Sequence, residues 1–266
     1  MMIDVSRYRF ETLREDEEFA FSRGRSDDGN LPAILSVAPV SERPVQGILE
    51  RFEHEYSLRD ELDSDWAARP LVLVREGRPA LILEDPGGEP LDRLLGKPME
   101  LSQFLRFGVG LASALSKLHK RGLIHKDIKP ANILVNSATG AIRLTGFGIA
   151  SRLPYQRQSP APPEIIAGTL AYMAPEQTGR MNRSISTRSD LYSCGVTLYQ
   201  MLTGALPFVA TDALGWVHCH VARQPTPPFD RVPVPELLSS LTMKLLAKNA
   251  EDRYQTASGL EADLER

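Results

Sequence analysis

The order of segments along the chain constrains its fold more than any other feature. Up to about Glu84 the sequence has short stretches with strand-like alternation and one stretch, residues 45–62, with helical spacing. From Leu91 onward the helical spacing dominates, first in a long amphipathic segment over residues 101–120. Strands followed by helices indicate an α+β domain. We therefore expect a small lobe of five strands and one helix (1–84), a hinge (85–90) and a large helical lobe (91–266).

Composition excludes several classes of function. The 266 residues are 42% hydrophobic and 24% charged, which is typical of a domain with a buried core. A net charge of −3 argues against nucleic acid as the main partner, since a phosphate backbone requires a basic surface. The two cysteines, Cys194 and Cys219, are too few for a disulfide framework or a paired metal site. No apolar run approaches the roughly 20 residues of a membrane span, so we expect a cytoplasmic module.

Four motifs beyond residue 120 agree in order and spacing. Residues 123–135 read LIHKDIKPANILV, and residues 168–176 read GTLAYMAPE. Residues 190–195 read DLYSCG, and Asp252 and Arg253 follow near the end. Together these resemble the catalytic loop, the end of the activation segment and two structural motifs of Ser/Thr protein kinases. The resemblance covers about residues 8–266 and implies the bilobal protein kinase fold.

One segment resembles a narrower group. Residues 171–183, AYMAPEQTGRMNR, are similar to the N-terminal kinase-like domain of large bacterial multidomain sensor histidine kinases. That resemblance implies a role in two-component signal transduction, with an ATPase-like module, a sensor module and a histidine kinase downstream. We expect the chain to be one segment of a longer protein. Its partners would be other proteins or the downstream modules of the same polypeptide.

Three catalytic-loop residues match the kinase pattern. Asp127 stands where the family has the residue that accepts the substrate hydroxyl proton. Lys129 corresponds to the lysine that contacts the transferred phosphate, and Asn132 to the ligand of the second metal ion. The alternative is a polar loop kept for folding, because Asp and Asn also stabilise tight turns.

Two positions that handle charge depart from the kinase pattern. Gly146, in the sequence GFG, replaces the aspartate that binds Mg²⁺ in the family, and glycine offers no side-chain oxygen. Asn132 alone would be a weak metal site. Residues 33–36 read AILS where the family has VAIK, so we expect Ser36 in the place of the phosphate-binding lysine.

Glu55 corresponds to the helix glutamate that pairs with the missing lysine. An unpaired buried carboxylate is costly, so we expect Glu55 to face water, to be protonated, or to pair with Arg23 or Arg25. An ordinary solvated surface position is an equally open interpretation.

The nucleotide cleft is altered at two further places. Residues 14–18, REDEE, take the position of the glycine-rich loop, and their carboxylates would repel a triphosphate, although an ordinary solvated turn also explains them. Leu83 and Glu84 lie at the hinge, and the resemblance places Leu134 under the adenine position. Pro86 follows in the hinge and has no N–H to donate.

The residues that support the fold look complete. Glu176 and Arg253 are expected to form a buried, bidentate ion pair. Asp190 is expected to hold the backbone of the catalytic loop. The resemblance gives packing roles to His125 and Phe147, and it gives Thr169 a hydrogen bond to the catalytic aspartate.

These observations favour a pseudokinase, a kinase fold with impaired phosphoryl transfer that serves as a regulatory or scaffold module. An active Ser/Thr kinase with a non-standard metal and phosphate site is the first alternative; it would need Arg23 or Arg25 to reach the phosphates. A nucleotide-binding sensor without catalysis is the second. No cofactor is certain: any ATP binding should be weak, and Mg²⁺ binding is not expected.

Overall fold

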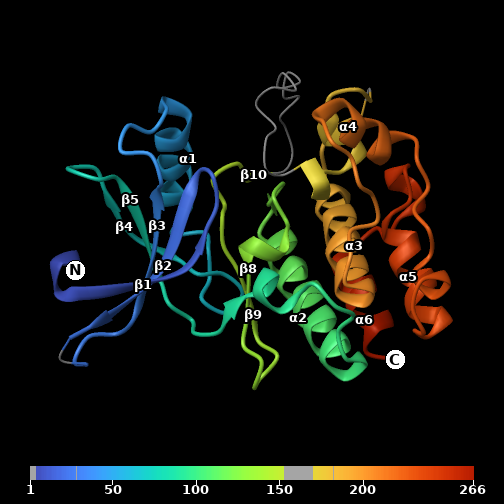
Figure 1. Cartoon of the computed structure of the whole chain (residues 1–266), viewed down its shortest axis with the longest axis horizontal. Helices are drawn as coiled ribbons and strands as arrows, with labels where there is room; N and C mark the ends of the chain where they lie inside the picture. Colours follow the sequence, from blue (N-terminus) through green and yellow to red (C-terminus); the bar gives the residue numbers. More distant parts are fainter. Residues whose placement is uncertain (1–3, 28, 153–169, 182) are drawn as a thin grey trace.

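The computed structural model describes residues 4–27, 29–152, 170–181 and 183–266, which form two lobes side by side (Figure 1). The small lobe contains the N-terminal strands and one helix, and the large lobe contains the remaining helices. The expected bilobal α+β architecture is therefore confirmed. No helix among the described residues is long and apolar enough to cross a membrane.

The small lobe is built on one antiparallel sheet with the strand order β1-β2-β3-β5-β4. Alternation along the central strands directs one set of apolar side chains toward a core that includes Phe52 of the helix. The elements are β1 (Tyr8–Glu15), β2 (Phe19–Ser26), β3 (Ile34–Pro39), α1 (Gln46–Ser57), β4 (Pro70–Val74) and β5 (Ala80–Glu84).

Helix α1 is shorter than its apolar periodicity predicts, because it ends at Ser57 instead of continuing to Leu62. Turns follow, and they carry Leu58, Leu62 and Trp66 into the core of the large lobe. The apolar side chains of this segment thus pack between the lobes instead of forming one face of a longer helix.

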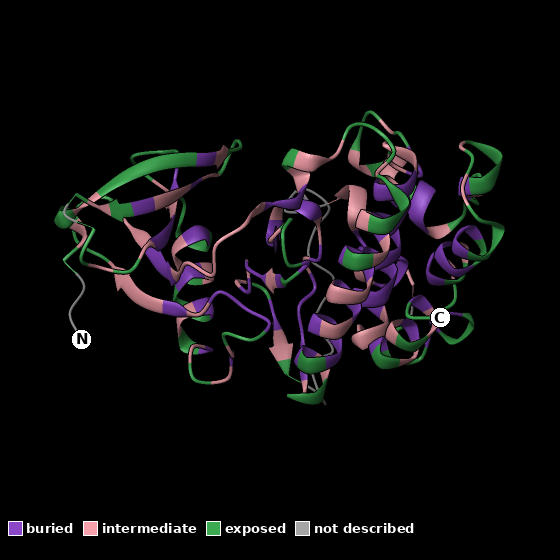
Figure 2. Cartoon of the chain, turned by 90° about the horizontal axis from the view of Figure 1, so that it is seen from below, coloured by how far each residue is buried: buried purple, intermediate pink, exposed green. Residues whose placement is uncertain are grey.

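The large lobe surrounds helix α3, most of whose residues are buried (Figure 2). Helix α2 has the bounds predicted from its periodicity, and the Glu100 side chain caps it by accepting N–H groups of Ser102 and Gln103. The helices are α2 (Leu101–Lys120), α3 (Thr187–Thr203), α4 (Ala213–Val221), α5 (Glu236–Leu245) and α6 (Ala257–Leu264).

Short strands at the junction of the lobes position the candidate site. Strands β6, β8 and β9 form a three-stranded sheet, and β7 pairs with β10. These pairings place the loop after β7 beside the loop after β9, so residues 125–132 and 145–150 face the same cleft. The strands are β6 (Glu89–Pro90), β7 (Leu123–Ile124), β8 (Ile133–Val135), β9 (Ile142–Leu144) and β10 (Ser151–Arg152).

Candidate active site

Asp190, at the start of α3, holds the catalytic loop from below. Its carboxylate accepts the backbone N–H of His125 at 2.9 Å and that of Lys126 at 2.8 Å, and His119 Nε2 lies 2.9 Å from Oδ2. Asp190 is fully buried. These bonds keep Lys126 at φ 69°, a left-handed conformation that is strained for a residue other than glycine.

The three catalytic-loop residues predicted from the sequence lie together. Lys129 Nζ is 3.0 Å from Asp127 Oδ2. The side-chain amide of Asn132 donates to the same oxygen at 2.8 Å and to the backbone carbonyl of Asp127 at 2.9 Å. Asp127 is therefore held in a fixed orientation at the floor of the cleft.

His125 is a neutral packing residue that supports Asp127. Its Nε2 lies 2.9 Å from the carbonyl oxygen of Thr145, and its Nδ1 accepts the N–H of Asp127 at 3.2 Å. The ring packs against Phe147 with a centroid distance of 4.6 Å, and Phe147 in turn packs against Trp66. Burial lowers the pKa of His125, which favours the uncharged imidazole that this pair of contacts requires.

Gly146 leaves space that Asn132 takes up. Gly146 has φ 78°, and a Cβ atom built there would lie 2.8 Å from Cγ of Asn132. The Asn132 side chain is turned toward Asp127, as its hydrogen bonds show. No group of three or more His, Cys, Asp or Glu side chains among the described residues could hold a metal ion. At the two positions where the kinase pattern implies Mg²⁺ ligands, Gly146 has no side-chain oxygen, and the Asn132 amide donates to Asp127.

Glu55 does not face water, so the solvent-facing state is excluded from the three states expected for it, and so is the solvated surface position. It is 5% exposed, and its Oε1 accepts the N–H of Gly146 at 3.3 Å. The amides of Phe147 and Gly148 also stabilise its charged form, but burial dominates and raises the pKa of Glu55 to about 7. Among the described residues, this helix carboxylate thus binds backbone amides of the GFG segment and pairs with no cation.

On β3, the residue on the cleft side is Val37 and not Ser36, which corrects the expected register by one residue. Side chains alternate along a strand, and Leu35 and Val37 pack on the core side of β3. Val37 also lines the cleft. Ser36 therefore points to the opposite face of the sheet. Val37 places hydrocarbon on the cleft side of β3.

The turn between β1 and β2 brings carboxylates to the roof of the cleft. Asp16 closes the turn by accepting N–H groups of Glu18 at 2.9 Å and Phe19 at 2.8 Å. Glu18 pairs with Arg51 of α1 at 3.2 Å. With Glu17, these carboxylates line a cavity of about 710 Å³ whose floor includes Asp127 and Asn132.

The hinge residues are engaged with the chain itself. Leu83 is fully buried, and the N–H of Glu84 donates to the carbonyl of Arg69 at 2.8 Å. Ser64 donates to the Glu84 carboxylate at 2.6 Å. Leu134, expected under the adenine position, is 1% exposed.

Arg23 does not pair with Glu55, because Asp85 of the hinge occupies it. Its Nε and Nη2 donate to the two Asp85 oxygens at 2.6 and 2.9 Å. A second bond from Nη2 reaches the carbonyl of Gly88 at 2.7 Å. Arg25 is exposed on β2. The active-kinase alternative therefore loses Arg23 as a substitute for the lysine.

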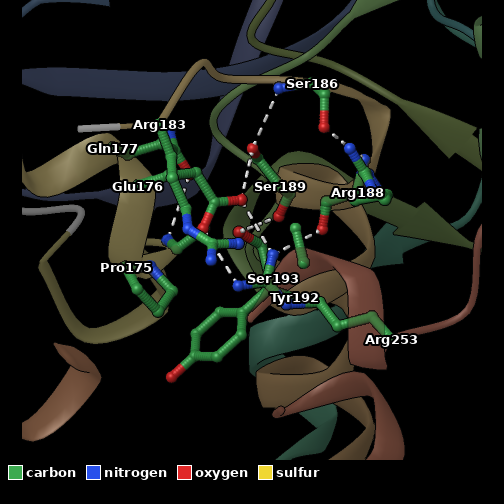
Figure 3. A network of polar contacts seen from close by, with 12 residues as sticks. Pro175, Glu176, Gln177, Arg183, Ser186, Arg188, Ser189, Tyr192, Ser193 and Arg253 are labelled. Carbon is green, nitrogen blue, oxygen red and sulfur yellow. Dashed lines mark hydrogen bonds and ion pairs between the residues drawn. The ribbon is translucent and has the colours of Figure 1, made fainter. Parts of the chain in front are cut away.

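A buried polar network fixes the end of the activation segment to the large lobe (Figure 3). The Arg253 guanidinium donates to both oxygens of Glu176, at 2.8 and 2.9 Å, and Ser189 donates to Oε1 at 2.7 Å. Arg253 also donates to three backbone carbonyls, those of Arg188, Ala247 and Lys248. Every hydrogen-bonding nitrogen of the guanidinium thus has a partner. Thr169 lies outside the described residues.

The sequence alone did not identify Val37 or the Arg23–Asp85 pair as parts of the cleft. The alternation along β3 carried a signal for Val37, since Leu35 and Val37 fit a buried face better than Ser36 does. The Arg23–Asp85 contact joins residues 62 positions apart, and no local pattern indicates it.

Comparison with known proteins agrees with this geometry. A family model described as the protein kinase domain matches residues 55–263. The chain is 37% identical over 191 residues to the serine/threonine-protein kinase PknB of Mycobacterium leprae, covering 71% of this chain and 30% of that protein. It is 38% identical over 170 residues to the protein of the same name from Mycobacterium tuberculosis, covering 64% of this chain and 27% of that protein.

The chain thus spans less than a third of the length of these relatives. The family match leaves out residues 1–54, which contain β1 to β3 and the acidic turn. It includes the catalytic loop, Gly146 and the Glu176–Arg253 pair. With the bilobal fold and four motifs in their expected order, the match shows that the chain belongs to the protein kinase family.

Proposed function

We propose that this domain is a pseudokinase, a member of the protein kinase family that serves as a regulatory or scaffold module in the cytoplasm. The observation that carries the proposal is the close approach of the Asn132 side chain to the position that a Cβ atom of residue 146 would take. Gly146 supplies no carboxylate, and the Asn132 side chain fills the space where one would lie. Kinase chemistry depends on metal ions that bridge the phosphates, and this arrangement does not provide for them.

The charges around the cleft support the same conclusion. Phosphoryl transfer requires cations that neutralise the triphosphate and hold it in line with the acceptor. Val37 offers hydrocarbon on the cleft side of β3, where the kinase pattern has a lysine. Asp16, Glu17 and Glu18 line the roof of the cavity; of the cations that also line it, Arg51 pairs with Glu18 and Lys129 with Asp127. Each tenfold loss of rate corresponds to about 1.4 kcal/mol, so several such changes together reduce transfer strongly.

The proposed setting is a multidomain bacterial signalling protein with a histidine kinase among its downstream modules. The resemblance of residues 171–183 supports it. In this setting the domain would act through protein contacts with partners or with other modules of its own polypeptide.

A transfer assay tests the proposal. The domain would be incubated with ATP labelled at the γ-phosphate, with Mg²⁺ or Mn²⁺ and a generic protein acceptor, beside the Asp127→Asn variant. We expect the wild-type domain to incorporate no more label than this variant. The kinase domain of one of the PknB relatives would serve as the positive control for the assay.

An active Ser/Thr kinase is the second candidate, and two observations favour it. Asp127, Lys129 and Asn132 lie in contact at the floor of the cavity, and Asp127 Oδ1 has no hydrogen-bond partner among the described residues. The relatives are also named as Ser/Thr protein kinases. Incorporation that disappears in Asp127→Asn would establish this activity and overturn the pseudokinase proposal.

A further inference from the structure

An apolar cluster joins the two lobes at the back of the cleft. Leu134 of β8 belongs to the large lobe, yet it packs in the core of the small lobe with side chains from β1, β2, β3 and β5. Those side chains include Leu13, Phe21, Leu35 and Leu83, and each of the five is at most 8% exposed. This inter-lobe cluster, defined here as Leu13, Phe21, Leu35, Leu83 and Leu134, is buried and continuous.

The open cavity lies beside this cluster and not within it. Among the described residues, the cavity is lined by the β1–β2 turn, by α1 and by the loops after β7 and β9. Phe21 and Val37 form its boundary on the sheet side, while Leu35, Leu83 and Leu134 do not line it. A ligand in the cavity would therefore have to displace buried side chains to reach the hinge.

Polar contacts hold the same region closed from the hinge side. The Arg23–Asp85 pair is largely buried, with side-chain exposures of 11% and 4%. Gly88 packs so tightly on β8 that a Cβ atom there would lie 2.4 Å from the carbonyl oxygen of Val135. The Asp85 carboxylate and the Gly88 carbonyl next to the cluster are thus already bonded to Arg23. Pro86 has no N–H to donate to a ligand.

We propose that the inter-lobe cluster fills the position that adenine would take, so that the cleft is closed by the chain's own side chains and takes no adenine nucleoside, with or without metal. The inference rests on the pseudokinase proposal. The observations behind it, the burial of the cluster and the lining of the cavity, are separate from those at Gly146. Under this proposal, Phe21, Leu35 and Leu134 are the residues that exclude adenine. The loss of the metal aspartate alone would leave adenine binding intact.

Thiol labelling measures the closure directly. Leu134→Cys places a thiol in the cluster, and Val37→Cys places one on the wall of the open cavity as the matched control. The two native cysteines are buried, so their background reaction is slow. We expect the thiol at position 134 to react with a small disulfide reagent at least about a hundredfold more slowly than the thiol at position 37. Similar rates in the two folded variants would overturn the proposal.

Adenosine, which carries neither phosphate nor metal, is the ligand probe for the wild-type domain. A ligand that binds the native state at a hundredfold excess over its Kd raises the melting temperature by several degrees. We expect no change up to millimolar adenosine, and a saturable rise would overturn the inference whether or not Leu134→Cys folds. Adenosine binding without phosphate transfer would contradict this inference alone, whereas label transfer dependent on Asp127 would contradict the pseudokinase proposal.

Discussion

The two sides of the cleft differ in how their polar groups are used. On the large-lobe side, Asp190 and the Glu176–Arg253 pair are buried, and each carboxylate faces donors at hydrogen-bond distance. On the small-lobe side, no cation pairs with Glu55 among the described residues, and Val37 lines the same cavity. The residues that build a kinase fold are therefore separable from the residues that hold a nucleotide, because the two sets do not overlap.

The largest effect is expected when the large-lobe network is broken. Arg253→Met leaves the buried Glu176 carboxylate without its partner and removes donors from three carbonyls. Breaking a buried ion pair in this way costs about 3–5 kcal/mol. Urea unfolding should show a loss of this size in the free energy of unfolding. A loss no larger than that of a surface substitution would contradict the assigned role of the network.

Two variants sharpen that result. Glu176→Met/Arg253→Met removes both charges and should recover only part of the loss, since the carbonyls still lack their donor. Arg183→Gln, which breaks the exposed pair with Glu251, should leave the unfolding transition in place.

The pH dependence of stability tests the small-lobe side. The folded pKa of Glu55, about 7, lies above its ordinary value of 4.5, so the unfolded chain releases this proton more readily. The contribution of Glu55 is therefore greatest below about pH 4.5 and is lost as the pH rises toward about 7, by at most about 3 kcal/mol. Unfolding at pH 5, 6, 7 and 8 should show this slope as the difference between wild type and Glu55→Gln, because the buried His125 and His220, whose pKa values are lowered, contribute a slope of the opposite sign to both proteins.

Glu55→Gln should remove the Glu55 component of the slope between pH 5 and 7, because the amide does not titrate. Glu50→Gln, an exposed carboxylate on the same helix, should leave it unchanged. Identical slopes in wild type and Glu55→Gln would mean that burial does not control this carboxylate.

A smaller effect is expected from restoring the metal residue alone. Gly146→Asp introduces a Cβ atom at 2.8 Å from Asn132 and a side chain at φ 78°. We expect a loss of about 1–3 kcal/mol in stability and no Mg²⁺-dependent phosphate transfer. Gly146→Ala provides the control for backbone strain. Transfer by Gly146→Asp would show that a single position silences the domain.

The smallest effect is expected on the roof of the cleft. Glu18→Gln removes the partly exposed pair with Arg51 and should change the free energy of unfolding by less than about 1 kcal/mol. A larger change, measured by urea unfolding, would mean that the acidic turn supports the fold instead of being an ordinary solvated turn.

Motif spacing and periodicity were enough to predict the bilobal fold and the grouping of the catalytic-loop residues. The helix over residues 101–120 has its predicted bounds because its periodicity and its capping residue agree. The prediction for Ser36 is one residue out of register, because matching a motif to a short strand does not determine which alternate residues face the core. The state of Glu55 depends on backbone amides 91 positions away, which only the folded chain brings near.

The most direct test of the central claim, that this cleft takes no metal–nucleotide, is the melting temperature of the wild-type domain in increasing ATP, measured without metal, with Mg²⁺ and with Mn²⁺. A bound ligand raises it with the logarithm of ligand concentration over Kd. We expect no rise in the melting temperature up to millimolar ATP under any of the three conditions. A saturable rise that requires metal would contradict the claim.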